Sequence, residues 1–271
     1  MVRLHPVPTL GGVRLDRLNA LRVQSLYGRK LEAGLSPRSV EIVHATLHKA
    51  LKQAVRGLLV PRNVAEAATP PRPAKREIVP LSREQARALL EAAKGDPLRA
   101  FYVLAVTTGM RNGELPGLQW RDVDLGAGTL RVRRSVFNGV VSPPKTAAGN
   151  RTIRLTGTAV AALREHRLTT ARRRMSEWVF STEKGTSISV HNVHNRPWRP
   201  LLKRAGLPAS TRMHDLRHTC ATLLLSRGVP VKVVSEMLGH GDVEITLGAY
   251  QSVLPDMQES AARVMEEAPG E

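Results

Sequence analysis

A proline-rich segment divides this 271-residue chain into two unequal parts. The sequence TPPRPAKREIVP, residues 69–80, contains four prolines and no helical repeat of apolar side chains. Proline fixes its own φ and has no amide hydrogen, so such a segment is extended and ends any helix that reaches it. We therefore expect two domains, residues 1–68 and residues 81–271, joined by a linker over residues 69–80.

The charge of the chain favours a polyanionic partner. Lys and Arg number 41 against 23 Asp and Glu, which gives a formal net charge of +18. The imbalance is strongest before and within the linker, where residues 1–76 hold 14 Lys or Arg and 4 Asp or Glu. A chain this basic is suited to nucleic acid or to an anionic membrane surface.

Nucleic acid is the preferred partner. The apolar stretches are far shorter than the roughly 20 residues of a membrane-spanning helix, and the first residues lack the apolar region of a signal peptide. The single cysteine, Cys220, cannot form an intramolecular disulfide. We expect a cytoplasmic, nucleoid-associated protein with no membrane association.

The sequence before the linker predicts a long helix with one basic face. Ser36 can cap its first turn, Pro37 suits the first helical position, and the pattern runs to about Gly57. At 100° per residue, one face is apolar and consists of Val40, Val43, Leu47, Leu51 and Ala54. The opposite face carries four cations within an arc of about 60°, namely Arg38, Lys49, Lys52 and Arg56. Such a stripe is either an ordinary solvated face or a surface that lies along a phosphate backbone.

After the linker, the pattern predicts helices with clear start signals. Ser82 and Gln85 form a capping box for one helix, and Asp96-Pro97 begins another that ends near Gly109. From about residue 159 onward the pattern is again mostly helical.

Between these helical regions the sequence predicts short strands. Apolar residues alternate around Leu130 and Ile153, and Asn138-Gly139 suits a hairpin turn between strands. The second domain is therefore expected to be an α+β unit, mainly α with one small antiparallel β-sheet, beside a small all-α first domain.

Four motifs contain polar residues that have no evident structural role. They are TTGMRNGEL with Arg111, the loop residue Lys145, HDLRH with His214 and Arg217, and LGH with His240, followed by Tyr250. A loop lysine is most often plain surface. A His–Arg pair three residues apart on a helix is most often an ordinary hydrogen-bonded couple, although it can also bind an anion.

In combination these motifs resemble the tyrosine recombinases of the phage integrase family. Residues of the expected type occupy the family's six catalytic positions in the expected order, over roughly 140 residues. The resemblance implies the catalytic set Arg111, Lys145, His214, Arg217, His240 and Tyr250, with Tyr250 as the nucleophile. The other two tyrosines, Tyr27 and Tyr102, lie within apolar helical patterns.

The chemistry of DNA cleavage explains these residue types. Guanidinium groups bind phosphate oxygens bidentately and stay protonated, so Arg111 and Arg217 are expected to clamp the phosphate. We assign proton removal from the tyrosine to His214 and protonation of the departing 5′ oxygen to Lys145. His240 is expected to donate a hydrogen bond to the phosphate. Because the arginines supply positive charge, we expect no metal, no ATP and no other cofactor.

The first domain resembles the family's helical core-binding domain, which forms a C-shaped clamp around double-stranded DNA with the catalytic domain. The resemblance favours the second interpretation of the basic stripe, with its cations on DNA. We expect a monomer in solution, a homotetramer on DNA, and accessory factors that bend DNA or set the direction of recombination. Residues 254–267 are interpreted as a short amphipathic helix that docks on a neighbouring protomer.

Two features depart from the family pattern. The chain is interpreted as beginning partway into the core-binding domain, and Pro116 falls just after the first turn of a helix expected from Asn112. The main interpretation is a site-specific recombinase that integrates or excises a mobile element. The alternatives are a truncated, non-catalytic DNA-binding homologue that competes for recombination sites, and a type IB topoisomerase that uses the same covalent chemistry.

Overall fold

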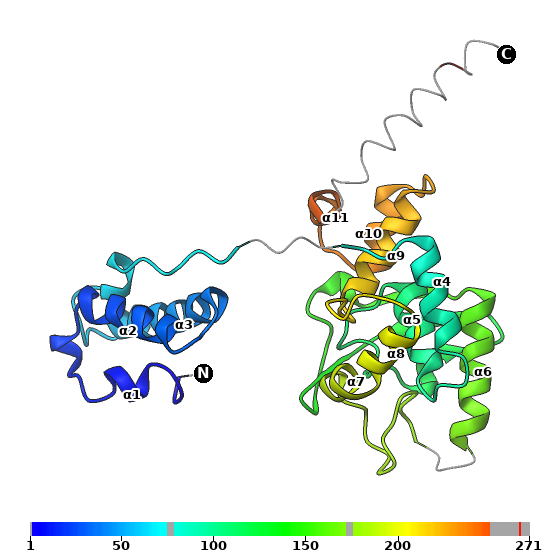
Figure 1. Ribbon diagram of the computed structural model, residues 1–271, viewed down its shortest axis with the longest axis horizontal. Coiled ribbons are helices and arrows are strands. Elements are labelled where there is room, and N and C mark those ends of the chain that lie inside the picture. Colours follow the sequence, from blue (N-terminus) through cyan, green and yellow to red (C-terminus); the bar gives the residue numbers. More distant parts are fainter. Residues whose placement is uncertain (1, 75–78, 172–175, 250–265, 267–271) are drawn as a thin grey trace. The chain divides into compact units, whose positions relative to one another are not determined.

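A computed structural model describes residues 2–74, 79–171, 176–249 and 266 (Figure 1). The chain divides into two compact units, Met1–Glu77 and Ile78–Glu271. Tyr250 lies outside the described residues, and of the helix expected over residues 254–267 only Glu266 is described.

The described part of the first unit is helical. Its helices are α1 (Val7–Leu10), α2 (Ala20–Glu32) and α3 (Pro37–Arg56), with 3₁₀ turns at η1 (Leu15–Arg17) and η2 (Val64–Ala67). The α3 start signal is confirmed, because the Ser36 side chain accepts a hydrogen bond from the amide of Ser39 and Pro37 is the first helical residue. Helices α2 and α3 share one apolar core with the η2 turn.

The two faces predicted for α3 are confirmed. Val40, Val43 and Leu51 are buried in the core of the first unit. The cations of the stripe, Arg38, Lys49, Lys52 and Arg56, are all exposed. Arg38 forms an ion pair with Glu41 on the same helix. Lys49, Lys52 and Arg56 have no ion-pair partner among the described residues, so they remain available to an anionic ligand.

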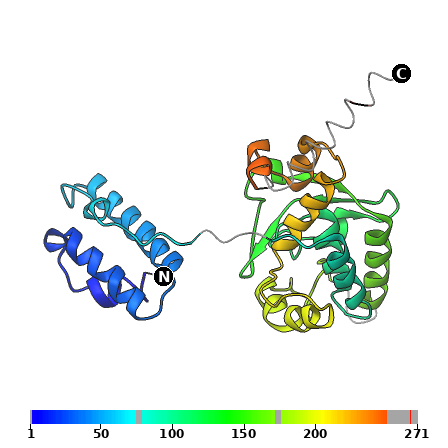
Figure 2. The same ribbon diagram turned by 45° about the horizontal axis from the view of Figure 1, so that its top comes forward.

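The second unit packs helices around one large core. Its helices are α4 (Arg83–Ala92), α5 (Arg99–Thr108), α6 (Gly157–Ala171), α7 (Val190–Val193), α8 (Arg199–Arg204), α9 (Asp215–Leu225), α10 (Val231–Leu238) and α11 (Val243–Ala249). The capping box of Ser82 and Gln85 is present. A π-helical turn, η5 (His194–Trp198), joins α7 to α8 at one end of the unit, and α10 and α11 lie at the other (Figure 2). No described helix is long and apolar enough to cross a membrane.

Helix α5 is the centre of this core. Its residues from Ala100 to Val106 are all buried, and it packs against α6 and α9. Phe101 stacks edge-on against Phe180, with ring centroids 5.0 Å apart. Tyr102 of α5 is fully buried, as is Tyr27 in the first unit, so neither phenol is exposed for chemistry.

Strands form two small antiparallel sheets in the described chain, where the sequence predicted one. The strands are β1 (Val123–Asp124), β2 (Thr129–Val132), β3 (Ser135–Phe137), β4 (Val140–Ser142) and β5 (Arg151–Arg154). Strands β1, β2 and β5 form one sheet, in which Leu130 pairs with Ile153. Strands β3 and β4 form a separate hairpin through the predicted Asn138-Gly139 turn, where both residues have positive φ. Arg133 and Arg134 lie between β2 and β3, and both form ion pairs with the buried carboxylate of Asp122.

The helix expected from Asn112 is not formed. Residues 112–117 make successive turns instead. Pro116 has no amide hydrogen, and Gly113 and Gly117 pack too closely against residues 134–136 for a side chain. The segment therefore leaves α5 as a tight corner that holds Arg111.

We predict that the corner at the end of α5 requires glycine. Gly109 has a φ of 59°, and an added Cβ would lie 2.5 Å from Leu238 Cδ2. Gly206 is a matched control, since its φ is 66° but nothing lies within 4 Å of its Cβ position. Gly109→Ala should lose about 1 to 3 kcal/mol more stability than Gly206→Ala because of overpacking. Urea unfolding followed by tryptophan fluorescence measures this, since the tryptophans are all in the second unit; equal losses would contradict it.

Candidate active site

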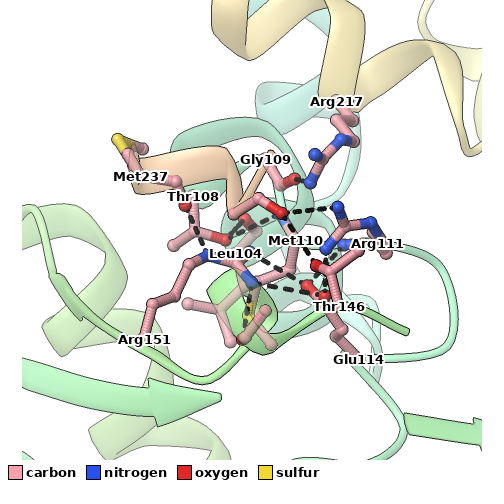
Figure 3. Close-up of polar contacts among 12 residues, drawn as sticks. Leu104, Thr108, Gly109, Met110, Arg111, Glu114, Thr146, Arg151, Arg217 and Met237 are labelled. Carbon is pink, nitrogen blue, oxygen red and sulfur yellow. Dashed lines mark hydrogen bonds and ion pairs between the residues drawn. The ribbon is translucent and has the colours of Figure 1, made fainter. Parts of the chain in front are cut away.

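Two arginines from different segments bind the carbonyl groups at the ends of two helices. Arg217 of α9 donates from Nη1 to the Gly109 carbonyl, at 2.7 Å, where α5 ends. Arg111 donates from Nη2 to the Gly239 carbonyl, also at 2.7 Å, where α10 ends. The last carbonyls of a helix lack partners and carry partial negative charge, so they suit guanidinium groups. The predicted Arg111 and Arg217 are thereby brought to one place (Figure 3).

Both of these helix ends use a left-handed glycine. Gly109 and Gly239 have φ values of 59° and 70°. A Cβ on Gly239 would lie 2.8 Å from Arg151 Nη1 and 2.9 Å from the Ala148 carbonyl oxygen. The close approach of the loop before β5 to the end of α10 therefore depends on the absence of a side chain at Gly239.

The carboxylate of Glu114 fixes Arg111. Oε1 accepts from Arg111 Nη1 at 2.8 Å, and Oε2 accepts from the Arg111 amide at 2.9 Å. The Glu114 side chain is only 1% exposed. Burial raises the pKa of the Glu114 carboxyl, but hydrogen bonds and charges from Arg151 and then Arg111 outweigh it, so this pKa is lowered. Glu114 is therefore an ionised anchor at neutral pH.

Arg151 completes this anchor from β5. It donates to both oxygens of Glu114, from Nη1 at 3.2 Å and from Nη2 at 2.9 Å. Figure 3 shows the side chains of Arg111, Arg151 and Glu114 pointing toward one another. The sequence analysis assigned no role to Glu114 or Arg151. The spacing of Glu114, three residues after Arg111 within one motif, was a usable signal, whereas nothing local indicated the contact with Arg151.

The histidines of HDLRH lie beside this arginine cluster. His214 immediately precedes α9, and its ring meets that of His218 edge-on, with centroids 5.4 Å apart. Partial burial, followed by the charge of Arg217, lowers the pKa of His214 below its ordinary value. Burial and then His214 lower the pKa of His218 to about 4. Both rings are therefore neutral at physiological pH and able to accept a proton.

His240 follows the glycine that ends α10. Its Nδ1 lies 2.7 Å from the hydroxyl of the buried Thr246 in α11. Burial, followed by the charges of Arg217 and Arg111, lowers the pKa of His240 to about 4. A neutral ring carries one N–H, and a Thr246 hydroxyl that donates to Nδ1 places that hydrogen on Nε2. His240 can then act as a hydrogen-bond donor without carrying a charge.

The structure does not bring all six predicted residues together by direct contact. Lys145 is exposed on the loop between β4 and β5 and makes no hydrogen bond or ion pair with the described residues. Its neighbour Thr146 donates to the Gly239 carbonyl, at 3.4 Å, so the loop lies against the end of α10. Tyr250 follows Ala249, the last residue of α11, and lies outside the described residues.

Comparison with known proteins decides the family. A model described as the phage integrase family matches residues 80–256. This chain belongs to the phage integrase family. It is 32% identical over 286 residues to an integrase of Streptomyces ambofaciens, which covers 97% of this chain and 72% of the relative. The tyrosine recombinase resemblance inferred from the sequence is confirmed.

Solved integrase structures share the fold. The Tn1549 transposon integrase in complex with transposon right-end DNA superposes with a TM-score of 0.77 at 21% identity, over 96% of this chain and 90% of that one. A lambda integrase tetramer bound to a Holliday junction gives a TM-score of 0.63 at 20% identity, over 84% of this chain and 66% of that one. The expected fold class, mainly α with a small antiparallel sheet, is confirmed, and the second small sheet is an addition to it.

We predict that Glu114→Gln strongly destabilises the second unit. The change removes the only buried negative charge that contacts Arg111 and Arg151 among the described residues, and breaking such a buried pair costs about 3 to 5 kcal/mol. Glu91→Gln is the matched control. Glu91, which is exposed on α4, pairs with the exposed Lys94 just after that helix, so this substitution should change stability little. Urea unfolding at pH 7 gives both values, and similar values for the two variants would show that Glu114 is not an anchor.

Proposed function

We propose that this protein is a site-specific DNA recombinase that cleaves and rejoins DNA strands through a 3′-phosphotyrosine on Tyr250. Membership of the phage integrase family supports recombination as the reaction. The observation that carries the chemistry is the convergence of Arg111 and Arg217 beside the neutral His240. The biological setting would be integration or excision of a mobile element.

The arginines suit a phosphate in the transition state. A phosphodiester under attack spreads negative charge over its non-bridging oxygens, and guanidinium groups fixed in advance stabilise that charge. Arg111 and Arg217 each bind one helix-end carbonyl. A guanidinium has five N–H groups, so bonds that orient it are compatible with bidentate donation to a phosphate. Because the arginines supply the positive charge, the proposed reaction requires neither a metal ion nor ATP.

Proton transfers complete the proposed step. The Tyr250 oxygen attacks phosphorus and forms a P–O bond while the bond from phosphorus to the 5′ oxygen breaks. The phenol, with an ordinary pKa near ~10, gives its proton to neutral His214. The departing 5′ oxygen takes a proton from Lys145, and His240 donates a hydrogen bond to the phosphate. Attack by a 5′-hydroxyl of another strand on the phosphotyrosine then reverses these transfers and rejoins the DNA.

Double-stranded DNA is the proposed partner. The solved Tn1549 integrase with the same fold is in complex with transposon-end DNA, and the lambda integrase forms a tetramer on a Holliday junction. We propose that this chain is a monomer in solution and a homotetramer on DNA, assisted by factors that bend DNA or set direction. Gel filtration with and without DNA checks this, and a stable tetramer without DNA would contradict it.

Covalent trapping tests the proposed chemistry. Nicked DNA from the ends of the element, incubated with the protein without metal, should give a denaturant-resistant adduct that maps to Tyr250 and is abolished by Tyr250→Phe. Tyr102→Phe is the matched control and should keep the adduct, because the Tyr102 hydroxyl is buried and has no partner in the described structure. DNA binding without any adduct would indicate a non-catalytic, competing homologue. An adduct with DNA relaxation but no strand exchange would indicate a topoisomerase.

We predict that the exposed stripe on α3 contacts DNA phosphates. Changing Lys49 and Lys52 to Gln should reduce the slope of log affinity against log salt by about 2, because each lost phosphate contact contributes about 0.9. The matched control changes Lys94 and Lys232 to Gln, since both form exposed ion pairs on the second unit. Filter binding at several salt concentrations measures the slope. An equal change of slope in both double variants would show that the stripe does not contact DNA.

A further inference from the structure

The loop that carries Lys145 has few attachments to the rest of the second unit. Residues 145–148 are exposed, and Gly149 is buried at the end of the loop. Side-chain bonds from Thr146 to the Gly239 carbonyl and from Arg151 to the Gly149 carbonyl hold it to the domain. The first bond is long, at 3.4 Å, and the second is 3.1 Å. A third side-chain bond, from Arg131 Nε to Asn150 Oδ1, is 3.3 Å long. The position of the loop therefore depends on few bonds, and Arg151 makes the shortest of these three.

The Arg151 side chain connects three segments. Besides its bonds to Glu114, Nε donates to the Met237 carbonyl in α10 at 2.6 Å, and Nη1 donates to the Gly149 carbonyl. The side chain is 7% exposed. Only a planar guanidinium offers donors in these directions at once, whereas a lysine ammonium is a single point of charge. Arg151 thus ties the end of the Lys145 loop both to Glu114 and to the end of α10.

We propose that Arg151 is a positioning residue that places the Lys145 loop against the arginine site, so that Lys145 can protonate the departing 5′ oxygen. The inference rests on the proposed function, and it adds a residue with no assigned role. In this proposal Arg151, which is buried, acts through the loop and not on the DNA or the reacting atoms.

The contacts of Arg111 separate this role from the phosphate clamp. The two bonds of Arg111 to Glu114 and its bond to the Gly239 carbonyl do not involve Arg151. The loop, in contrast, loses its bond at Gly149. Loss of Arg151 therefore acts on proton donation to the leaving group more than on binding of the phosphate.

A sulfur substitution in the DNA distinguishes the two effects. In ordinary DNA, the bond from phosphorus to the 5′ oxygen breaks as Lys145 gives its proton to that oxygen. When the bridging 5′ oxygen is replaced by sulfur, the bond from phosphorus to sulfur breaks and the electron pair leaves as a thiolate. A thiol has a pKa near ~8.5, so this leaving group needs no proton donor.

The experiment compares adduct formation on the two DNA substrates. Arg151→Lys keeps the charge beside Glu114 but cannot make all of the bonds, and misplacement of a catalytic group by about 1 Å can cost 10²-fold. We expect a loss of about 10- to 100-fold on ordinary DNA and a rate within about threefold of the unmodified protein on sulfur-bridged DNA. Lys145→Ala should show the same rescue, whereas Arg111→Lys should be impaired on both substrates.

An equal loss on both substrates, or no loss on either, would overturn the proposal for Arg151. If circular dichroism shows that Arg151→Lys is unfolded, Thr146→Val is used in its place. Thr146 is exposed, and this change removes only the bond from the loop to the Gly239 carbonyl. It should be impaired on ordinary DNA and rescued by sulfur, and an unrescued loss or no loss would overturn the proposal. An unmodified protein that forms no adduct on either DNA would instead contradict the proposed function.

Discussion

The carboxylate of Glu114 is the interaction on which the geometry of the candidate site depends. It is buried, and it accepts hydrogen bonds from the guanidinium groups of Arg111 and Arg151, which are 40 residues apart in the sequence. A charge in that position is costly unless its partners stay in place, so the packing of α5, β5 and α10 has to maintain them. Packing of the core therefore holds Glu114 in place, and Glu114 in turn fixes the orientation of Arg111.

The excess of positive charge around this anchor has a second effect. Arg111 and Arg151 bind the buried Glu114 carboxylate, and burial together with the charges of Arg217, Arg111 and Arg151 keeps the nearby His240 uncharged. Burial and the charge of Arg217 likewise lower the pKa of His214, the ring to which we assign proton removal. The same arrangement therefore serves the binding of an anion and the proton transfers next to it.

Local signals predicted much of the fold, and non-local contacts account for most of what they missed. The caps at Ser36 and Ser82 and the turn at Asn138-Gly139 lie within a few residues of the structure they specify, so the sequence shows them directly. The missing helix after Arg111 depends on how residues 113 and 117 pack against residues 134–136. The contact of Arg151 with Glu114 depends likewise on the tertiary fold. The motifs located the arginine residues of the site, but apart from the spacing of Glu114 they did not indicate which contacts hold these residues.

The division into two basic units affects how long such a protein stays on DNA. When two tethered units each bind a polyanion weakly, the tether keeps the second near the surface whenever the first is bound. The protein then leaves the DNA only when both units are detached at the same time. This avidity effect slows release without any additional contact between protein and DNA. Residence time would therefore change with the length and stiffness of the tether, even where every residue that touches DNA is unchanged.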